Sequence, residues 1–251
     1  MVLATVVLVG GCAPGSDVFG GGSSMPHGTS SAGPASSPSH NGSAGPTTSA
    51  GSTGAATADP ESTTTCEYVQ TGVAARPVQL PSATGVPTTG TVTYVLTMTN
   101  GAVRLRLDRT KAPCTVHSFE SLADQGFFTA TRCQRLVDKA FFILQCGDPS
   151  GTGTGGPGYS FASETDGTES YTKGVVAMAN SGHNLNGSQF FLVWDDSTSL
   201  DRDGGYTIFG TIDAASIAVV ASMAAEGQDG TDPRGGGRPN NRCEITRVTR
   251  S

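Results

Sequence analysis

Arg135 and Gln145 are two polar residues ten positions apart in an apolar stretch, with Phe141-Phe142-Ile143-Leu144 between them. On two paired strands, an arginine and a glutamine at this spacing are difficult to assign to a core, because a buried charge needs a partner. Neither residue is a nucleophile. A cationic donor in a dry pocket can instead stabilise a group whose charge distribution changes in a transition state. The pair therefore indicates an electrostatic role for Arg135 rather than nucleophilic chemistry.

The segment 151–156 matches the pattern G-x-G-x-x-G and follows an expected strand, so a dinucleotide site has to be considered. Pro157-Gly158-Tyr159 stands where a helix should begin, so no helix N-terminus would face a pyrophosphate. The pattern therefore favours a glycine loop at one end of a β fold.

Other catalytic chemistries find little support. The part of the chain after Cys66 contains two histidines, His117 among helix core positions and His183 in a polar loop, and no G-x-S-x-G elbow. A Ser-His-Asp triad that uses His183 is possible, but the fold would have to bring a serine and an aspartate to it by coincidence. Four aspartates are typical of turns beside Gly204-Gly205 rather than of a glycosidase pair: Asp195, Asp196, Asp201 and Asp203.

The cysteines indicate disulfides rather than a metal site, because they form no C-x-x-C pair and no histidine cluster accompanies them. We expect Cys133 to pair with Cys146, since both flank the far end of a hairpin and opposite Cα atoms lie within disulfide reach. Cys114 is a competing partner for either, and Cys66 with Cys243 could tie the chain ends together.

The N-terminus is similar to a lipoprotein signal peptide. Residues 2–9 are apolar and lead into Gly10-Gly11-Cys12, which resembles a lipobox with Cys12 as the lipidated residue. No Lys or Arg precedes the apolar run, and a start codon placed too far downstream would explain their absence. We therefore expect residues 1–12 to be a signal segment and the protein to lie outside the cytoplasm, anchored to the membrane by lipid only.

The chain of 251 residues contains 35 Gly and 14 Pro, and its composition changes along its length. Residues 13–65 consist mostly of Gly, Ala, Ser, Thr and Pro, which predicts a disordered linker. We expect residues 66–90 to be an extended lead-in and residues 91–251 to be the folded domain. The net charge of −6 argues against nucleic-acid binding through a basic face.

The sequence of the folded part predicts short strands and two helices. Apolar residues alternate over 92–98 and 103–107 around Asn100-Gly101, which predicts a hairpin with a type I′ turn. Further strands are expected at 132–137, 140–145, 175–179, 189–194, 207–212 and 244–249. Helices are expected from Val116 to Gly126 and from Asp213 to Gly227. The pattern predicts a mainly β fold, a closed eight-stranded antiparallel barrel capped by two helices.

The order of several motifs resembles the cyclophilin family of peptidyl-prolyl cis/trans isomerases over roughly residues 91–249. The motifs are Arg135, Phe-x-x-Gln-x-Gly-Asp ending at Asp148, the glycine loop, Met178-Ala179-Asn180, Asn186-Gly187-Ser188-Gln189-Phe190-Phe191 and Phe209-Gly210. The linker and the extra cysteines are similar to those of secreted cyclophilins from high-GC Gram-positive bacteria. The resemblance implies a prolyl isomerase that assists folding outside the cytoplasm and needs no cofactor or metal.

The resemblance also implies the roles of residues. Arg135 is the expected catalytic donor, and the expected substrate-binding residues are Phe142, Ile143, Gln145, Gly153, Ala179, Asn180, Gln189, Phe191, Leu200 and Tyr206. The chain is two residues longer between Arg135 and Gln145 than familiar eukaryotic members, and it has Ser199 and Tyr206 where they have Trp and His. The expected partners are proline-containing polypeptides, bound by a monomer. The alternative is a non-catalytic lipoprotein that uses the groove as a peptide clamp or chaperone.

Overall fold

The computed structural model of the chain describes residues 62–180, 184–202 and 205–251. Cys12, the expected signal segment, residues 13–61 of the expected linker, His183 and Asp203 lie outside the described residues. The described part has two α-helices, α1 (Pro113–Asp124) and α2 (Ala214–Ala224), and a short 3-10 helix, η1 (Thr198–Arg202). Its strands are β1 (Thr63–Thr64), β2 (Val69–Gln70), β3 (Val86–Pro87), β4 (Thr91–Met98), β5 (Gly101–Asp108), β6 (Thr131–Arg132), β7 (Arg135–Lys139), β8 (Phe141–Cys146), β9 (Tyr159–Ala162), β10 (Val175–Asn180), β11 (Leu185–Asp195), β12 (Ile208–Ile212) and β13 (Glu244–Arg250).

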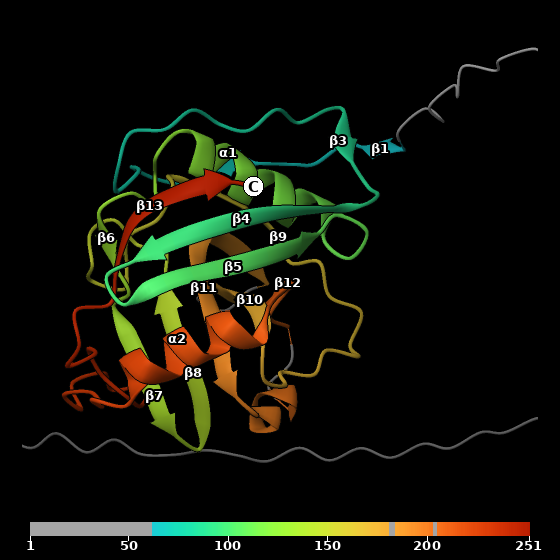
Figure 1. Cartoon of the computed structure of the whole chain (residues 1–251). Coiled ribbons are helices and arrows are strands. Elements are labelled where there is room, and N and C mark those ends of the chain that lie inside the picture. Colours follow the sequence, from blue (N-terminus) through green and yellow to red (C-terminus); the bar gives the residue numbers. More distant parts are fainter. Residues whose placement is uncertain (1–61, 181–183, 203–204) are drawn as a thin grey trace, which may run out of the picture. The chain divides into compact units, whose positions relative to one another are not determined.

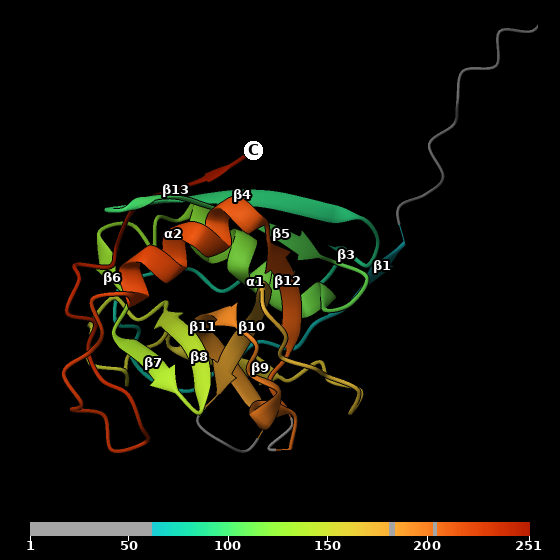
Figure 2. The same cartoon turned by 60° about the horizontal axis from the view of Figure 1, so that its bottom comes forward.

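The strands form a strongly curled antiparallel sheet, which Figures 1 and 2 show from two sides. The order of paired strands is β2-β9-β11-β10-β12-β5-β4-β13-β6, and β8 pairs with both β11 and β7. A mainly antiparallel β fold with two helices is thus confirmed. Closure of the sheet into an eight-stranded barrel stays a prediction.

The β4–β5 hairpin follows the alternation of its sequence. Val92, Tyr94, Leu96 and Met98 are all buried, while their neighbours face outward. The two-residue loop is Thr99–Asn100, because Gly101 already pairs with Met98. The expected type I′ turn at Asn100-Gly101 is therefore wrong by one position. A Cβ on Gly101 would lie 3.0 Å from a methyl group of Val219, so this strand start lies close against α2.

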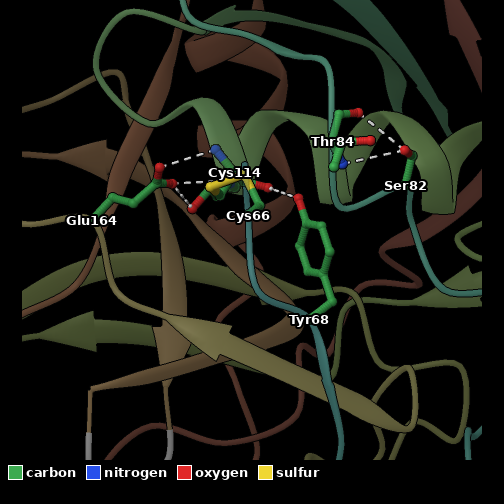
Figure 3. Close-up of a disulfide and its surroundings, with 7 residues drawn as sticks. Cys66, Tyr68, Ser82, Thr84, Cys114 and Glu164 are labelled. Carbon is green, nitrogen blue, oxygen red and sulfur yellow. Dashed lines mark hydrogen bonds between the residues drawn. A yellow bond between two sulfur atoms is a disulfide. The ribbon is translucent and has the colours of Figure 1, made fainter. Parts of the chain in front are cut away.

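Helix α1 begins without a side-chain cap of its own. Ala112 precedes it and Pro113 opens it, a position where proline loses no hydrogen bond. The carboxylate of Glu164 accepts from the N–H groups of Cys114 and Thr115 at 2.9 and 2.8 Å, as Figure 3 shows for the region around Cys114. A carboxylate at a helix N-terminus accepts from N–H groups that have no partner within the helix. Its negative charge also interacts favourably with the helix dipole.

Both helices place apolar side chains on the sheet, as their spacing predicts. Val116, Phe119 and Leu122 of α1 belong to the main core. In α2, Asp213 accepts the N–H of Ser216 at 2.8 Å as the expected N-cap, and Val220 is fully buried. Helix α2 carries the chain to the loop at 225–243, which precedes β13.

Residues 62–90, here called the strap, are attached to this sheet at several points. β1 pairs with β3 within the strap, and β2 pairs with β9. The Cys66–Cys114 disulfide joins the strap to α1, and the Tyr68 hydroxyl donates to the Cys114 carbonyl at 2.8 Å (Figure 3).

The second disulfide joins Cys133 and Cys146, as predicted; Cys133 lies just before β7 and Cys146 ends β8. Cys243 is a free thiol and is buried. The pairing of Cys66 with Cys243, which the sequence left open, is therefore not formed. The helix start at Cys114 lies beside the strap, so Cys114 rather than Cys243 is the partner of Cys66.

Candidate active site

Arg135 and Gln145 lie opposite each other on β7 and β8. The register pairs Arg135 with Gln145, and Val137 with Ile143. Directly paired residues share one face of a sheet, so the four side chains project to the same side. The strands continue to Lys139, and the turn is at Ala140, whose φ of +70° is left-handed. The expected strands 132–137 and 140–145 imply a turn at Asp138-Lys139, and the observed turn is one to two residues later.

The guanidinium of Arg135 is buried, with 8% of the residue exposed. Its Nε donates to the Gly235 carbonyl at 3.0 Å, one Nη2 proton goes to the Arg234 carbonyl at 3.2 Å, and one Nη1 proton goes to Gln145 Oε1 at 3.3 Å. Its Cζ lies 5.8 Å from the centre of the Phe141 ring. Arginine has five N–H groups, so these bonds leave two of them for a ligand.

Asp232 supplies the counter-charge from the 225–243 loop. Its carboxylate lies 3.5 Å from Arg135 Nε and 2.7 Å from Arg234 Nη2. The hydrogen bond from Arg234, aided by the charge of Arg135, lowers the pKa of Asp232 to about 2. Burial lowers the pKa of Arg135, and the charge of Asp232 opposes that change. The arginine keeps its proton in either case, because its pKa starts above 12.

A chain of amide hydrogen bonds leads from Arg135 to the glycine loop at 151–156. Gln145 Nε2 donates to Gln189 Oε1 at 2.8 Å, and Gln134 Nε2 donates to the same oxygen at 2.9 Å. Gln189 Nε2 donates to the carbonyls of Gly153 and Gly155 at 3.1 and 2.9 Å. Each amide thus has its orientation fixed by its neighbour, which positions the side chains before any ligand binds.

The glycine loop is folded around the buried carboxylate of Asp148. The carboxylate accepts from the N–H groups of Ser150, Gly153 and Gly155 at 2.7, 2.7 and 3.0 Å, and from the Ser150 hydroxyl at 2.6 Å. Burial raises the pKa of Asp148, but these hydrogen bonds outweigh it and hold the pKa below its usual value. A Cβ on Gly155 would overlap the carboxylate, so only glycine fits there.

An apolar cluster separate from the main core lies beside Arg135. Ile143, Phe191 and Leu200 are buried in it, and Tyr206 packs against it. The ring of Tyr206 meets that of Phe191 edge to face at 5.6 Å. Phe141, which lies below the Arg135 guanidinium, also packs against the cluster. The cationic donor and this apolar cluster are therefore neighbours.

Phe142, expected in this pocket, lies elsewhere. Its ring packs edge to face against Trp194 with ring centres 5.0 Å apart. Successive residues of a strand face opposite sides, so Phe141, Ile143 and Gln145 share one face and Phe142 takes the other. Phe141 is the aromatic residue on the site face. Ser199 does not replace a ring at the rim; its hydroxyl donates to the Ala140 carbonyl at 2.9 Å.

A cleft of about 600 Å³ adjoins the apolar cluster and contains the other expected contact residues. Ala179 lines the cleft and also packs against the cluster, so the two are continuous. Asn180 lines it and donates to the Gly205 carbonyl at 2.8 Å. The lining residues include Gln145, Gly153, Gln189, Arg234 and, from the strap, Thr71, Gly72 and Val73.

The motifs rejected from the sequence have structural roles. The glycine loop leads into strand β9 rather than a helix. Asp201 accepts the N–H of Tyr171 at 2.9 Å, and Asp196 accepts that of Lys173 at 2.9 Å. His117 lies beside Tyr68, with ring centres 6.4 Å apart. In the described part of the chain, no group of three or more His, Cys, Asp or Glu could hold a metal ion, and no helix is long and apolar enough to cross a membrane.

Sequence reasoning missed four residues of this site, which are Phe141, Gln134, Asp232 and Arg234. Phe141 could have been found from strand alternation, since it stands two residues before Ile143 and four before Gln145. Gln134 and Asp232 carry no such signal. Asp232 reaches Arg135 from a loop almost a hundred residues away in the chain, and the glycines of that loop impose no periodic pattern.

Comparison with known families and curated proteins gives one consistent result. The family model described as cyclophilin type peptidyl-prolyl cis-trans isomerase matches residues 93–250. A Mycobacterium tuberculosis protein named "Probable peptidyl-prolyl cis-trans isomerase B" is 42% identical over 200 residues, which cover 73% of this chain and 63% of that protein. A Bacillus subtilis protein named "Peptidyl-prolyl cis-trans isomerase B" is 38% identical over 120 residues, 47% of this chain and 81% of that protein. The chain thus spans less than two thirds of its mycobacterial relative.

Solved structures agree on the fold. A Cryptosporidium parvum cyclophilin type peptidyl-prolyl cis-trans isomerase has a TM-score of 0.56 and 24% identity, covering 64% of this chain and 98% of that one. A second crystal structure of that protein, in the presence of the dipeptide Ala-Pro, has a TM-score of 0.54 and 25% identity, covering 62% and 97%.

Proposed function

The chain belongs to the cyclophilin-type peptidyl-prolyl cis-trans isomerase family, and from this premise we propose that it catalyses the cis/trans isomerisation of X-Pro bonds in polypeptides. The observation that carries the proposal is the buried Arg135, held in place by the 225–243 loop and Gln145 beside an apolar cluster. Two N–H groups of this buried cation bond none of the described residues beside the apolar cluster, so they are available to a ligand whose hydrogen bonds would offset the cost of burial.

The reaction requires rotation about a bond with partial double-bond character, against a barrier of about 18–20 kcal/mol. No bond is broken, so the step needs neither a nucleophile nor a cofactor. We assign to Arg135 the donation of a hydrogen bond to the prolyl nitrogen. Such a bond favours the pyramidal nitrogen of the twisted transition state and weakens the amide resonance that opposes rotation. A pocket that excludes water strengthens the effect.

The surrounding residues divide the work of binding. We place the proline ring against Ile143, Phe191 and Leu200, since the ring is apolar and these side chains are buried. The backbone next to the proline would lie in the adjoining cleft, where Gln145, Gln189, Asn180 and the carbonyls of the glycine loop are fixed by hydrogen bonds. The crystal structure of a related isomerase in the presence of the dipeptide Ala-Pro supports a proline-containing peptide as the ligand.

An isomerisation assay on the full chain with a proline-containing peptide tests the proposal. The wild type should accelerate exchange between the cis and trans peptide, measured by NMR exchange spectroscopy. Arg135→Ala should lower the rate by about 10²- to 10³-fold, because a single positioned donor commonly accounts for about 2.7–4 kcal/mol.

Arg132→Ala serves as the control, since Arg132 is exposed on the neighbouring strand β6 and should keep the wild-type rate. Undiminished turnover by Arg135→Ala would rule out this mechanism. Peptide binding without any acceleration by the wild type would instead support the non-catalytic clamp.

We further propose that the protein acts outside the cytoplasm as a lipid-anchored monomer that assists the folding of secreted proteins. The lipobox-like sequence before Cys12 and the two disulfides support this location, because disulfides persist in oxidising compartments. Metabolic labelling with a fatty-acid analogue should mark the wild type and leave Cys12→Ser unmarked. Equal labelling of both proteins would count against the anchor.

A further inference from the structure

The 225–243 loop brings a second arginine into the cleft. Arg234 is the only charged residue among the described residues that line it. Its guanidinium lies beside the glycine loop, since a Cβ on Gly153 would be 3.6 Å from Arg234 Nη2. The side chain is 59% exposed, so it faces the space that a ligand would fill.

The loop that carries Arg234 is firmly attached to β7. Gly237 exchanges two backbone hydrogen bonds with Leu136, at 2.8 and 3.0 Å, directly beside Arg135. Gln228 donates to the Asp138 carboxylate at 3.1 Å. A Cβ on Gly236 would overlap the Leu136 carbonyl oxygen, so the close approach of the loop requires glycine there. Arg234 is thus presented to the cleft from a fixed support.

Asp232 orients Arg234 but does not use all of the N–H donors of the Arg234 guanidinium. Nε and Nη2 of Arg234 bind the two carboxylate oxygens at 3.0 and 2.7 Å. Among the described residues, Nη1 has no hydrogen-bond partner. The three charged groups, Arg135, Arg234 and Asp232, sum to one positive charge at the edge of a cleft whose other lining residues are neutral. A carboxylate is the ligand group that complements such a fork.

From this geometry we propose that Arg234 is a specificity-determining residue that favours substrates with an acidic side chain close to the proline. The proposal rests on the proposed isomerase function, because it places the flanking residues of the substrate in the cleft. The recognition is electrostatic and partly exposed to solvent, so its effect is modest. We expect a Glu peptide to be preferred over the matching Gln peptide by about three- to fivefold at low ionic strength.

The test uses end-blocked peptides with one X-Pro bond and a single Glu, Gln or Lys, placed in turn at each of the three positions on either side of the proline. For each peptide the full chain is assayed for kcat/KM by NMR exchange and for Kd by NMR titration. The wild type should prefer Glu over Gln over Lys at one or more positions. Raising the ionic strength should bring the ratios towards one.

Arg234→Gln should bring the Glu-to-Gln ratio to about one, whereas Arg238→Gln should keep the wild-type ratio. Arg238 belongs to the same loop and is exposed, and it does not line the cleft. Arg234→Lys keeps the charge and should keep part of the preference. This variant shows whether the preference is lost only because the loop has moved. Comparing the Glu-to-Gln ratio within each variant serves the same purpose, because a general loss of activity cancels in the ratio.

Two outcomes would overturn the inference: a Glu-to-Gln ratio of one at every position in the wild type, or a preference that survives in Arg234→Gln. The proposed function fails separately. If no peptide is isomerised but Kd still shows a Glu preference that Arg234→Gln removes, the recognition role stands and the isomerase does not.

Discussion

At the residue scale, Asp232 balances two arginines that would otherwise repel each other. Arg135 and Arg234 both lie within 4 Å of its carboxylate, and the carboxylate itself is largely shielded from solvent. Burial lowers the pKa of Arg135, and the charge of Arg234 lowers it further. The two cations thus repel each other, and this repulsion grows as water is excluded. Asp232 therefore acts as a positioning residue, which allows one arginine to face the apolar cluster and the other to face the cleft.

The lowered pKa of Asp232, about 2, makes its contribution depend on pH. A carboxyl group whose pKa is lower in the folded state stabilises the fold above its unfolded pKa of about 3.9, and the contribution is lost as the pH falls through about 2. Asp232→Asn should therefore lower the free energy of unfolding most near neutral pH. The difference from the wild type should shrink between about pH 4 and pH 2.

Denaturant unfolding at several pH values measures this difference. Glu67→Gln removes the same charge from an exposed position and should leave the free energy of unfolding nearly unchanged. A gap between wild type and Asp232→Asn that stays constant down to pH 2 would contradict the assigned role.

The sequence allowed part of this site to be predicted. Arg135, Gln145 and Gln189 stand in or beside patterned strands, where period-two alternation reports which residues share a face. The structure brings these three together through direct hydrogen bonds. Asp232 and Arg234 could not be predicted, because their place depends on how a glycine-rich loop docks onto β7, a tertiary contact that leaves no local pattern.

At the scale of an element, the glycine loop is held by a single carboxylate, that of Asp148, which accepts the backbone N–H groups that a helix or strand would otherwise satisfy. The segment 151–156 forms no helix or strand. Two of its backbone N–H groups, those of Gly153 and Gly155, donate to the Asp148 carboxylate, as does the hydroxyl of Ser150 just before the segment. Those bonds turn the carbonyls of Gly153 and Gly155 towards Gln189. The loop is thus the last link in the chain of hydrogen bonds that begins at Arg135.

Asp148→Asn should loosen this loop. An amide offers one oxygen and places an NH₂ group where the other oxygen accepted bonds, so at least one buried donor loses its partner, at a cost of about 1–3 kcal/mol. We expect a lower unfolding free energy and a KM that rises more than kcat falls, because the backbone contacts of the cleft are affected and Arg135 is not.

Asp166→Asn is the matched control. Asp166 accepts from the N–H and hydroxyl of Thr168 in an exposed turn of similar local geometry, so its replacement should change stability by less than about 0.5 kcal/mol. Equal effects of the two substitutions would show that burial of Asp148 does not matter.

For helix α1, the position could be predicted from the sequence but the N-terminal cap could not. Its apolar spacing at Val116, Phe119 and Leu122 was sufficient to place it. Its N-terminal cap was not visible, because Ala112 cannot cap and the capping Glu164 lies 50 residues away from Cys114. Local rules find a cap only when the chain supplies it locally.

At the scale of the whole molecule, the two disulfides close loops of different lengths. Cys66–Cys114 spans 48 residues and Cys133–Cys146 spans 13. In the chain-entropy account, loops of these lengths stabilise the fold by about 4 and about 3 kcal/mol. The longer loop contains most of the strap and the entire β4–β5 hairpin.

The double variant Cys66→Ser/Cys114→Ser should therefore lose more stability than Cys133→Ser/Cys146→Ser. We expect the difference to be about 1 kcal/mol in the free energy of unfolding, measured by denaturant titration of both variants and the oxidised wild type. A larger loss from breaking the shorter loop would mean that local packing around Cys133 and Cys146, rather than chain entropy, decides the order.

The position of Cys66 also determines how the domain responds to a mechanical force applied from its N-terminal side. A force applied through the residues before Ser62 reaches Cys66 and passes across the sulfur–sulfur bond to Cys114 at the start of α1. The intact bond carries the tension past most of the chain between the two cysteines, while the hydrogen bonds between β1 and β3 pass a part of it to residues 86–87. With a reach of about 3.3–3.6 Å per residue, its 48-residue separation corresponds to about 160–170 Å of hidden length. Reduction of one disulfide would turn a stiff attachment into a long compliant one.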